Sequence, residues 1–356
     1  MFNTRVHTAH PQDAAGSIRS GAAGRRLPRT LTFLVAILAC LAAGTAAAQG
    51  LDDVLVEKFV QRMATKHDYD AAALRVLFAQ ANRQDAVLKA ISKPAEYKPW
   101  SEYRPIFLTP ERIQAGVAFW RGQSAALERA TQTYGVPAEI IVAIIGVETF
   151  YGRNTGSYRV LDALSTLAFN YPPRATFFTD ELENFLLLAR DEGVDPRTPT
   201  GSYAGAMGFP QFMPSSFRRF AVDFDADGHR NIWTDREDAI GSVANYLKEH
   251  GWEANRPVVL PAVASPAAEK LAADVEVPKR LLTEYVSSGV KPAAVVSDAS
   301  VPAMLLALDA EDGNEYWFGF RNFYAITRYN HSPKYAMAVT QLAQAIKLAR
   351  GSDPRL

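Results

Sequence analysis

Residues 140–152 read IIVAIIGVETFYG, and this stretch decides how the rest of the chain is interpreted. The eight residues 140–147 carry no charged or polar side chain, and Glu148 follows them directly. A helix that is apolar on nearly all its sides is a buried helix. Because Val136 and Pro137 begin this segment, Glu148 lies about three turns along it, with aromatic residues close behind. We therefore expect a single carboxylate at the edge of a helical core.

A carboxylate in that position is a candidate general acid. Desolvation disfavours its charged form and raises its pKa, so the group can hold a proton near neutral pH and deliver it to a leaving group. The alternative is an ordinary glutamate near the end of a helix, paired with Arg153. Sequence position alone leaves both interpretations of Glu148 open.

A second stretch, residues 200–216 (TGSYAGAMGFPQFMPSS), has the composition of a sugar-binding loop. Small residues let a ligand approach the backbone closely. Ser202 and Gln211 offer hydroxyl and amide groups beside aromatic rings. A sugar has hydroxyls around its edge and C–H groups on its faces, so this mixture suits it. The alternative is a loop that packs against the core.

Long blocks of the chain resemble the lytic murein transglycosylase B family. Between about residues 100 and 339 they follow in the same order as VETFYGRNTGSYRVLDALSTLAFNYPPR, GSYAGAMGFPQFMPSSF, DFDADGHRNIW, DAIGSVANYLKEHGW and FRNFYAITRYNHSPKYAMAV. Two departures are Thr149, where many members have serine, and Pro173, where an arginine beside Arg174 is expected. The resemblance implies a mainly α, α+β fold. It comprises a lysozyme-like catalytic core, an accessory helical part and a small β-containing subdomain.

The resemblance also implies a reaction. The family cleaves the β-1,4 bond between N-acetylmuramic acid and N-acetylglucosamine in peptidoglycan and leaves 1,6-anhydromuramoyl ends. Most glycosidases need two carboxylates, whereas Glu148 would act alone, first as an acid and then as a base toward the C6 hydroxyl of the same sugar. Two other functions remain open. One is a hydrolytic muramidase with Asp162 as its second carboxylate, and the other is a non-enzymatic, calcium-stabilised glycan-binding protein.

Eight residues at matching positions are implied to contact the glycan strand: Tyr103, Arg174, Ser202, Gln211, Tyr246, Tyr329, Asn330 and Tyr335. The tyrosines would line the cleft, the serine and the glutamine would contact sugars, and the asparagine and the arginine would bind polar groups of the substrate. Packing in the core or on the surface is the alternative for the tyrosines. Capping of a turn is the alternative for Asn330.

The stretch DFDADGHRNIWTDRED, residues 223–238, predicts a cation-binding loop. Carboxylates fall at positions 1, 3 and 5 of a calcium loop, with glycine at position 6 and a backbone carbonyl available at position 7. The residues concerned are Asp223, Asp225, Asp227, Gly228 and His229. The sequence therefore predicts a structural calcium ion, and it predicts no cofactor for catalysis.

The end of this loop is ambiguous. Position 12 is Thr234, where a bidentate glutamate is expected, so a standard loop fails. The family resemblance suggests a longer loop closed by Asp238, with Glu237 as its rival. Alternatively, Asp235 and Asp238 only cap the next helix.

Residues 1–48 have the pattern of a secretory signal. Arginines precede a short apolar run, and Ala46 and Ala48 supply the small residues of a cleavage site. Cys40, the only cysteine, is either part of a lipobox for membrane anchoring or a small residue of the apolar run; the large Leu38 favours the second interpretation. We expect export to a bacterial periplasm, where a large core stabilises a chain without disulfides.

The charge balance excludes one class of partner. Lysine plus arginine and aspartate plus glutamate both number 38 in the 356 residues. The leader holds five arginines and one aspartate, so the remaining chain has 38 − 5 = 33 basic and 38 − 1 = 37 acidic residues. Non-specific nucleic-acid binding needs a basic excess, so we expect none. The expected partners are glycan strands, with cell-wall synthesis proteins as further candidates, and we expect a monomer.

Residues 49–356 are predicted to form the catalytic region. Helical periodicity predicts helices at 51–66, 71–80, 109–134, 136 onward, 160–169, 179–190, 215–221, 235–250 and 336–350. A proline-rich connector is expected at 94–105. The part from about 256 to 330 is expected to be irregular or to contain β-structure, with a hairpin at 303–320 and a third strand at 322–329.

Overall fold

The structure is a computed structural model that describes residues 50–92, 98–272, 275–296 and 298–352. All described residues belong to one compact unit, Ala48–Leu356. The predicted leader 1–48, with Cys40, lies outside the described residues. Among the residues described, no single helix is long and apolar enough to cross a membrane. The pair Ser124–Tyr134 and Ala138–Thr149 passes that test jointly, but it is bent by 114°.

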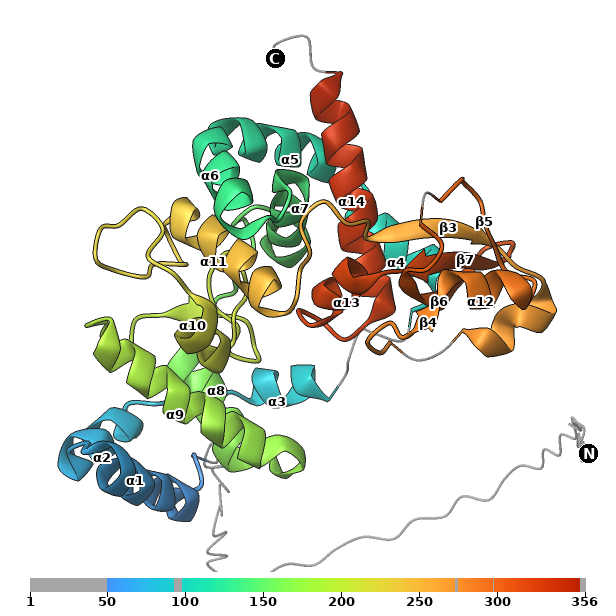
Figure 1. Cartoon of the computed structure of the whole chain (residues 1–356). Coiled ribbons are helices and arrows are strands. Elements are labelled where there is room, and N and C mark those ends of the chain that lie inside the picture. The colour runs from blue at the N-terminus through green and yellow to red at the C-terminus, as the bar shows by residue number, and fades with distance from the viewer. Residues whose placement is uncertain (1–49, 93–97, 273–274, 297, 353–356) are drawn as a thin grey trace, which may run out of the picture. The chain divides into compact units, whose positions relative to one another are not determined.

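The helix that carries Glu148 lies at the centre of the helical core. This helix, α7, spans Ala138–Thr149, and its residues from Ile140 to Gly146 are all buried. It packs against α5 (Pro110–Gly122), α6 (Ser124–Tyr134), α11 (Arg236–Glu249) and α14 (Pro333–Gly351), which is the red helix in Figure 1. The all-round apolar pattern of residues 140–147 therefore corresponds to a buried helix, as predicted.

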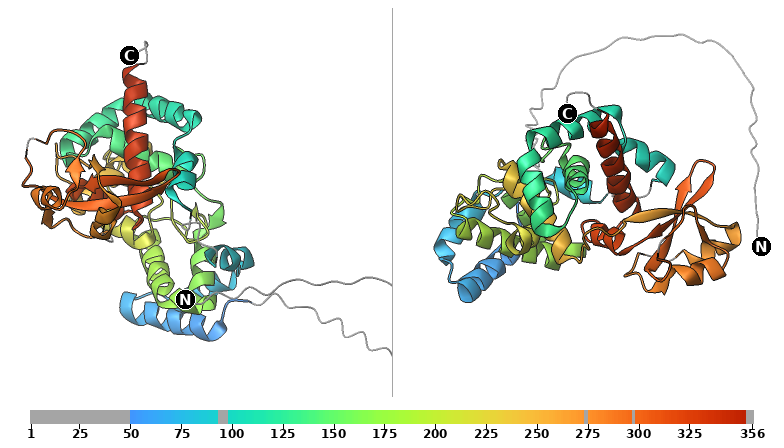
Figure 2. Two further views of the ribbon diagram at one scale, coloured as in Figure 1. Left: turned by 90° about the vertical axis from the view of Figure 1, so that its right-hand side faces the viewer. Right: turned by 45° about the horizontal axis from the view of Figure 1, so that its top comes forward.

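The other helices form two groups. The accessory helices are α1 (Asp53–His67), α2 (Ala71–Ala79), α3 (Asp85–Ile91) and α4 (Trp100–Phe107), and the middle of the chain forms α8 (Val160–Asn170), α9 (Ala175–Asp191) and α10 (Pro214–Phe220). Helix α1, blue in Figure 2, is joined to α9 by ion pairs of Arg62 with Asp180 and Glu183.

Two helical predictions were wrong in detail. The helix predicted over 109–134 is two helices, because Gln123 has φ −126° and leaves the helical region. Part of the connector predicted at 94–105 is helix α4, while 93–97 lie outside the described residues. Trp100 is buried, and the ring of Tyr103 packs against those of Trp100 and Phe107. This packing stabilises a helix that contains a proline.

A five-stranded antiparallel sheet follows α11, with strand order β4-β6-β7-β3-β5. Its strands are β3 (Val259–Val263), β4 (Arg280–Leu281), β5 (Lys291–Pro292), β6 (Pro302–Ala310) and β7 (Gly313–Gly319), drawn in orange in Figure 1. The short elements η2 (Pro266–Leu271) and α12 (Leu282–Ser287) connect them. The predicted hairpin is confirmed as β6–β7, which turns between Ala310 and Gly313.

The strand predicted at 322–329 is a helix, α13 (Arg321–Thr327). Short apolar runs are ambiguous between the two structures, and burial decides here. Phe323 and Ile326, three residues apart, are both fully buried on one helical face. Asn322 is also buried, and its side chain bonds to the backbone of Glu253 and Arg256.

Candidate active site

Glu148 is the penultimate residue of α7, and its side chain is only partly exposed. Burial raises the pKa of Glu148 from its usual 4.5 to about 7, and a hydrogen bond from Tyr335 opposes that shift. The Tyr335 hydroxyl donates to Oε1 of Glu148 at 2.6 Å. The alternative partner Arg153 instead pairs with Glu111 and lies over the ring of Phe150. Glu148 therefore has the properties predicted for a general acid near neutral pH.

Three of the predicted tyrosines gather beside Glu148. Tyr329 stacks on Tyr335 with ring centroids 6.4 Å apart and contacts Tyr246 at 4.7 Å. The negative charge of Glu148 is one of the causes that raise the pKa of all three, after burial. The hydroxyls of Tyr246 and Tyr329 are already committed to the backbone carbonyls of Arg328 and Pro210. These two residues therefore supply aromatic surface rather than free hydroxyls.

The loop after β2 (Thr200–Gly201) supplies the polar groups of the predicted sugar site. Ser202 and Gln211 line one cavity of about 490 Å³, together with residues of the 153–158 segment. The Ser202 hydroxyl accepts from the backbone of Ala206 at 3.0 Å, and the amide of Gln211 donates to the carbonyl of Thr155 at 3.1 Å. Gln211 has φ +50°, in the left-handed region. The loop is thus folded around its own polar groups, beside an open cavity.

Thr149 joins this loop to α7. Its buried hydroxyl lies 3.1 Å from the carbonyl oxygens of both Ile145 and Phe209, and it accepts from the backbone of Gly152 at 3.0 Å. The sequence indicated Thr149 only as a departure from the family pattern. A side chain that both donates and accepts, directly after the candidate acid, was the available signal for this connecting role.

The other predicted contacts are more dispersed. Tyr103 is partly exposed, and its charge is among the causes that raise the pKa of Tyr335, which indicates that it lies near the tyrosine cluster. Asn330 lines a cavity of about 570 Å³, but its side chain also caps the backbone of Ser332. Arg174 is exposed, and its guanidinium lies over the rings of Phe177 and Phe178. These described contacts do not connect Arg174 with Glu148.

Asp162, the candidate second carboxylate, has a structural environment. It is buried and accepts two hydrogen bonds from Arg159, at 2.7 and 2.9 Å. The backbone of Asn82 and the amide of Gln84 donate to the same carboxylate. An acid with all these partners ties α8 to the α2–α3 connection. It is therefore a poor candidate for a nucleophile or a base.

Three of the predicted metal ligands lie together. Carboxylate oxygens of Asp223, Asp225 and Asp227 lie within 4.8 Å of one another, on exposed side chains. Asp223 and Asp225 also accept from backbone N–H groups of the same loop, at 2.9–3.1 Å. Hard carboxylate oxygens on a tightly turned loop fit the ligand preference of calcium. The residues present therefore fit the predicted ion.

Asp238 has a different environment from that cluster. It is buried, and its two oxygens accept from the backbone of Phe224 and of Asn231, both at 2.6 Å. It therefore holds the two ends of the loop together by hydrogen bonds. Glu237, its rival, pairs with Arg129. Asp235 caps α11 as the alternative predicted, because it accepts from the backbone of residues 237 and 238.

The buried helix, the acid of raised pKa and the nearby aromatic rings are features of a class of protein, the enzymes that act on glycans with a carboxylic acid. Comparison with known proteins specifies it. The transglycosylase SLT domain family matches residues 52–344, and the chain belongs to that family. It is a lytic murein transglycosylase acting on peptidoglycan, with the lysozyme-like fold expected of the family.

Three relatives support this assignment. Membrane-bound lytic murein transglycosylase B of Escherichia coli (strain K12) is 49% identical over 304 residues, which cover 83% of each chain. The crystal structure of soluble lytic transglycosylase SltB1 from Pseudomonas aeruginosa has a TM-score of 0.79 and 54% identity, covering 83% of this chain and 99% of that one. Escherichia coli lytic transglycosylase Slt35 in complex with calcium has a TM-score of 0.79 and 47% identity, covering 87% and 99%.

Proposed function

We propose that Glu148 alone performs both proton transfers of the transglycosylase reaction. The observation that carries the proposal is the position of Glu148 at the end of the buried helix α7, with a hydrogen bond from Tyr335. Burial there raises its pKa to about 7. A group with that pKa is present in both protonation states near neutral pH, as a residue that acts first as acid and then as base requires. Asp162, already bonded to Arg159 and to backbone, is no second carboxylate for this site.

The reaction proceeds in two proton-balanced steps. Protonated Glu148 gives its proton to the oxygen that links N-acetylmuramic acid to N-acetylglucosamine, and the C1–O bond breaks. The C6 hydroxyl of the same muramoyl ring then attacks C1, and Glu148, now a carboxylate, takes the hydroxyl proton. The product is a 1,6-anhydromuramoyl end, and no water is consumed. A nucleophile tethered to the reacting ring has a high effective molarity, which replaces the usual second carboxylate.

Digestion of sacculi in oxygen-18 water tests this proposal. We expect new muramoyl ends that are lighter by one water than a hydrolysis product and that carry no label. The control is a muramidase digest of the same sacculi, in which the new ends must be labelled. Label at the ends made by this enzyme from the outset would mean that water attacks C1 directly, and the single-carboxylate mechanism would then be abandoned in favour of hydrolysis.

The glycan contacts follow from the same proposal. Ser202 and Gln211 line the cavity next to the 153–158 segment, and the tyrosine cluster of Tyr246, Tyr329 and Tyr335 surrounds Glu148. The aromatic rings exclude water from the reacting face, which favours the C6 hydroxyl over water as nucleophile. Tyr103, Asn330 and Arg174 complete the proposed set, at positions further along the strand.

We also propose that the 223–238 loop binds calcium in a structural role. Asp223, Asp225 and Asp227 would supply carboxylate oxygens and His229 its carbonyl, while Asp238 closes the loop. The calcium complex of Slt35 supports this proposal by analogy. In the cell, we infer export through the 1–48 leader to the periplasm, with residues 49–356 as the catalytic region. There the protein acts as a monomer on glycan strands, and cell-wall synthesis proteins are further candidate partners.

A further inference from the structure

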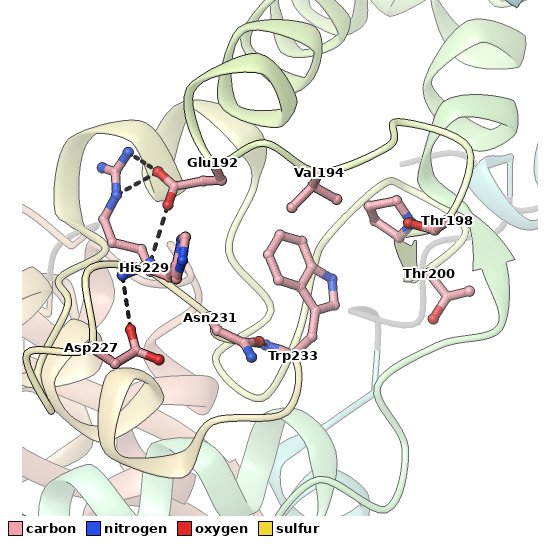
Figure 3. A pocket seen from close by; sticks show the side chains of 10 residues that line it. Glu192, Val194, Thr198, Thr200, Asp227, His229, Asn231 and Trp233 are labelled. Carbon is pink, nitrogen blue, oxygen red and sulfur yellow. Dashed lines mark hydrogen bonds and ion pairs between the residues drawn. The ribbon is translucent and has the colours of Figure 1, made fainter.

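A cavity of about 470 Å³ opens between the end of α9 and the cation loop. Figure 3 shows Val194 facing the indole of Trp233, with Thr198 and Thr200 on one side and Asp227 and His229 on the other. Its volume lies within the range of small-molecule sites. None of the residues assigned to the glycan cleft lines it, so this cavity is a separate feature of the molecule.

Hydrogen bonds and aromatic packing hold the residues that line this cavity in place. The buried Pro199 accepts a backbone hydrogen bond from Val160 of α8, which fixes the 198–200 segment. Trp233 packs against Phe217, and its backbone N–H donates to the side chain of Asn231. The indole Nε1 is buried without a hydrogen-bond partner among the described residues.

The charged side chains that line the cavity already have partners or belong to the cation loop. Arg230 pairs with Glu192 through its guanidinium, and its backbone N–H also donates to the same carboxylate, at 3.1 Å. Asp227 accepts from the backbone of His229 and belongs to the carboxylate cluster of the loop. An anionic ligand would meet an arginine that is already paired with Glu192, and the carboxylate of Asp227 belongs to the proposed calcium loop. The cavity therefore fits an uncharged molecule.

The remaining groups are those that recognise a sugar. Trp233, Val194 and Pro199 offer apolar surface for the C–H face of a ring, and the Thr200 hydroxyl can bond to its edge. The Thr198 hydroxyl donates to the carbonyl of Asp195 at 2.9 Å and can still accept from a sugar hydroxyl. An N-acetylglucosamine residue is uncharged, whereas a peptide-bearing muramoyl residue carries carboxylates. The lining thus favours the former.

The cavity and the cleft share one piece of backbone. Thr200 of β2 lines the cavity, and Ser202, two residues on, lines the cleft. Two residues of extended chain span about 7 Å. The partner strand β1 (Tyr158–Arg159) pairs with β2 and also contributes Tyr158 to the cleft. One glycan strand could therefore reach both places.

We propose that this cavity, lined by Val194, Thr198, Pro199, Thr200 and Trp233, is a second glycan-binding site that takes an N-acetylglucosamine residue outside the reacting cleft. Occupation of both sites by one strand would increase the effective concentration of glycan at the cleft. The enzyme would then hold long strands more tightly than short ones.

Fluorine NMR of 5-fluorotryptophan in the full chain tests the site with chitotetraose, an uncharged N-acetylglucosamine oligomer, as the probe. Glu148→Gln is included so that binding is measured independently of chemistry, and calcium is kept constant. Loss of one signal in Trp233→Phe assigns the resonance of Trp233. We expect that resonance to shift and saturate, while the resonance of Trp317, in the sheet, stays in place.

Two sets of variants locate the effect. Val194→Phe fills the cavity and should weaken the response at Trp233 by about tenfold or more. Thr198→Phe, at an exposed position where a larger side chain is tolerated, should do the same. Gln211→Ala in the cleft should leave the response within about twofold. An unmoved Trp233 resonance, a response that survives both filling variants, or a response to a stem peptide but not to chitotetraose would each overturn the proposal.

Discussion

The end of α7 and the loop before α11 both present carboxylates, but their environments are opposite. Glu148 is a lone acid in an apolar setting, and burial raises its pKa to about 7. Asp223, Asp225 and Asp227 are exposed and lie within 4.8 Å of one another. Isolation and burial favour the uptake and release of a proton, whereas crowding and exposure favour the capture of a cation. The roles that we propose for the two regions thus use the same functional group, for chemistry in one and for stability in the other.

The largest effect is expected at Glu148. Glu148→Gln keeps the shape of the side chain and can still accept from Tyr335, but the amide can neither give nor take the required proton. We expect the rate of release of anhydromuramoyl products to fall by about a thousandfold or more, with folding intact.

Glu139→Gln is the matched control for this variant. Glu139 lies in the first turn of the same helix and pairs with Lys347 on α14. Its loss should leave the rate nearly unchanged, because a partly exposed ion pair contributes little. A Glu148→Gln enzyme that retained a tenth of the activity would remove the contrast between the two regions.

The loop should respond to calcium rather than to protons. An ion that binds the folded state alone stabilises it by about 2.7 kcal/mol at a concentration of one hundred times Kd. We therefore expect calcium to raise the thermal midpoint of the protein, and Asp225→Asn to remove most of that increase. Asp312→Asn, at the exposed turn of the β6–β7 hairpin, is the control and should keep the full response. Coincident melting curves with calcium and with chelator would mean that the loop is not a cation site at those concentrations.

A substitution at Asp238 measures the contribution of hydrogen bonding to the loop separately from that of ion binding. Asp238→Asn can satisfy only one of the two backbone N–H groups, of Phe224 and Asn231, that its carboxylate now accepts. We expect a loss of about 2 kcal/mol in the free energy of unfolding even without calcium. Urea denaturation of the wild type and the variant in the presence of chelator measures this loss in the free energy of unfolding. Asp235→Asn is the control, because asparagine caps a helix as well as aspartate does. A loss seen only when calcium is present would instead make Asp238 chiefly a ligand.

The sequence predicted the local features of the two regions but not the long-range contacts. The buried character of α7, the glutamate at its end and the three clustered aspartates follow from local pattern, since each depends on residues close together in the chain. The hydrogen bond between Tyr335 and Glu148 joins residues 187 positions apart, so no local pattern predicts it. The resemblance to a family placed Tyr335 in the site but did not specify its partner.

The wrong strand prediction has the same origin. Residues 322–329 were expected to form a strand, but 321–327 form α13, in which Phe323 and Ile326 are buried on one helical face. Burial against the rest of the fold thus decides an ambiguity that the local pattern leaves open. The role of Asp238 as a ligand stays a prediction, and its two oxygens also accept from the backbone of Phe224 and Asn231.

The smallest expected effect is a pH-dependent change in the free energy of unfolding, caused by the burial of the Glu148 carboxylate. Its pKa is about 7 in the folded chain and 4.5 when exposed, so between those values the folded state binds more protons than the unfolded state. Stability contributed by this group is therefore present below pH 4.5 and is lost as the pH rises toward 7. A shift of that size corresponds to at most about 3 kcal/mol, and partial exposure of the side chain reduces it to about 1–2 kcal/mol.

Glu148→Gln does not titrate, so it should be more stable than the wild type at pH 8 and show little difference at pH 4. Urea denaturation at the two pH values measures this, with Glu139→Gln as the variant that should show no such change. An equal effect of Glu148→Gln at both pH values would show that Glu148 is not held in an environment that disfavours its charge, and the basis for its role as the acid would be lost.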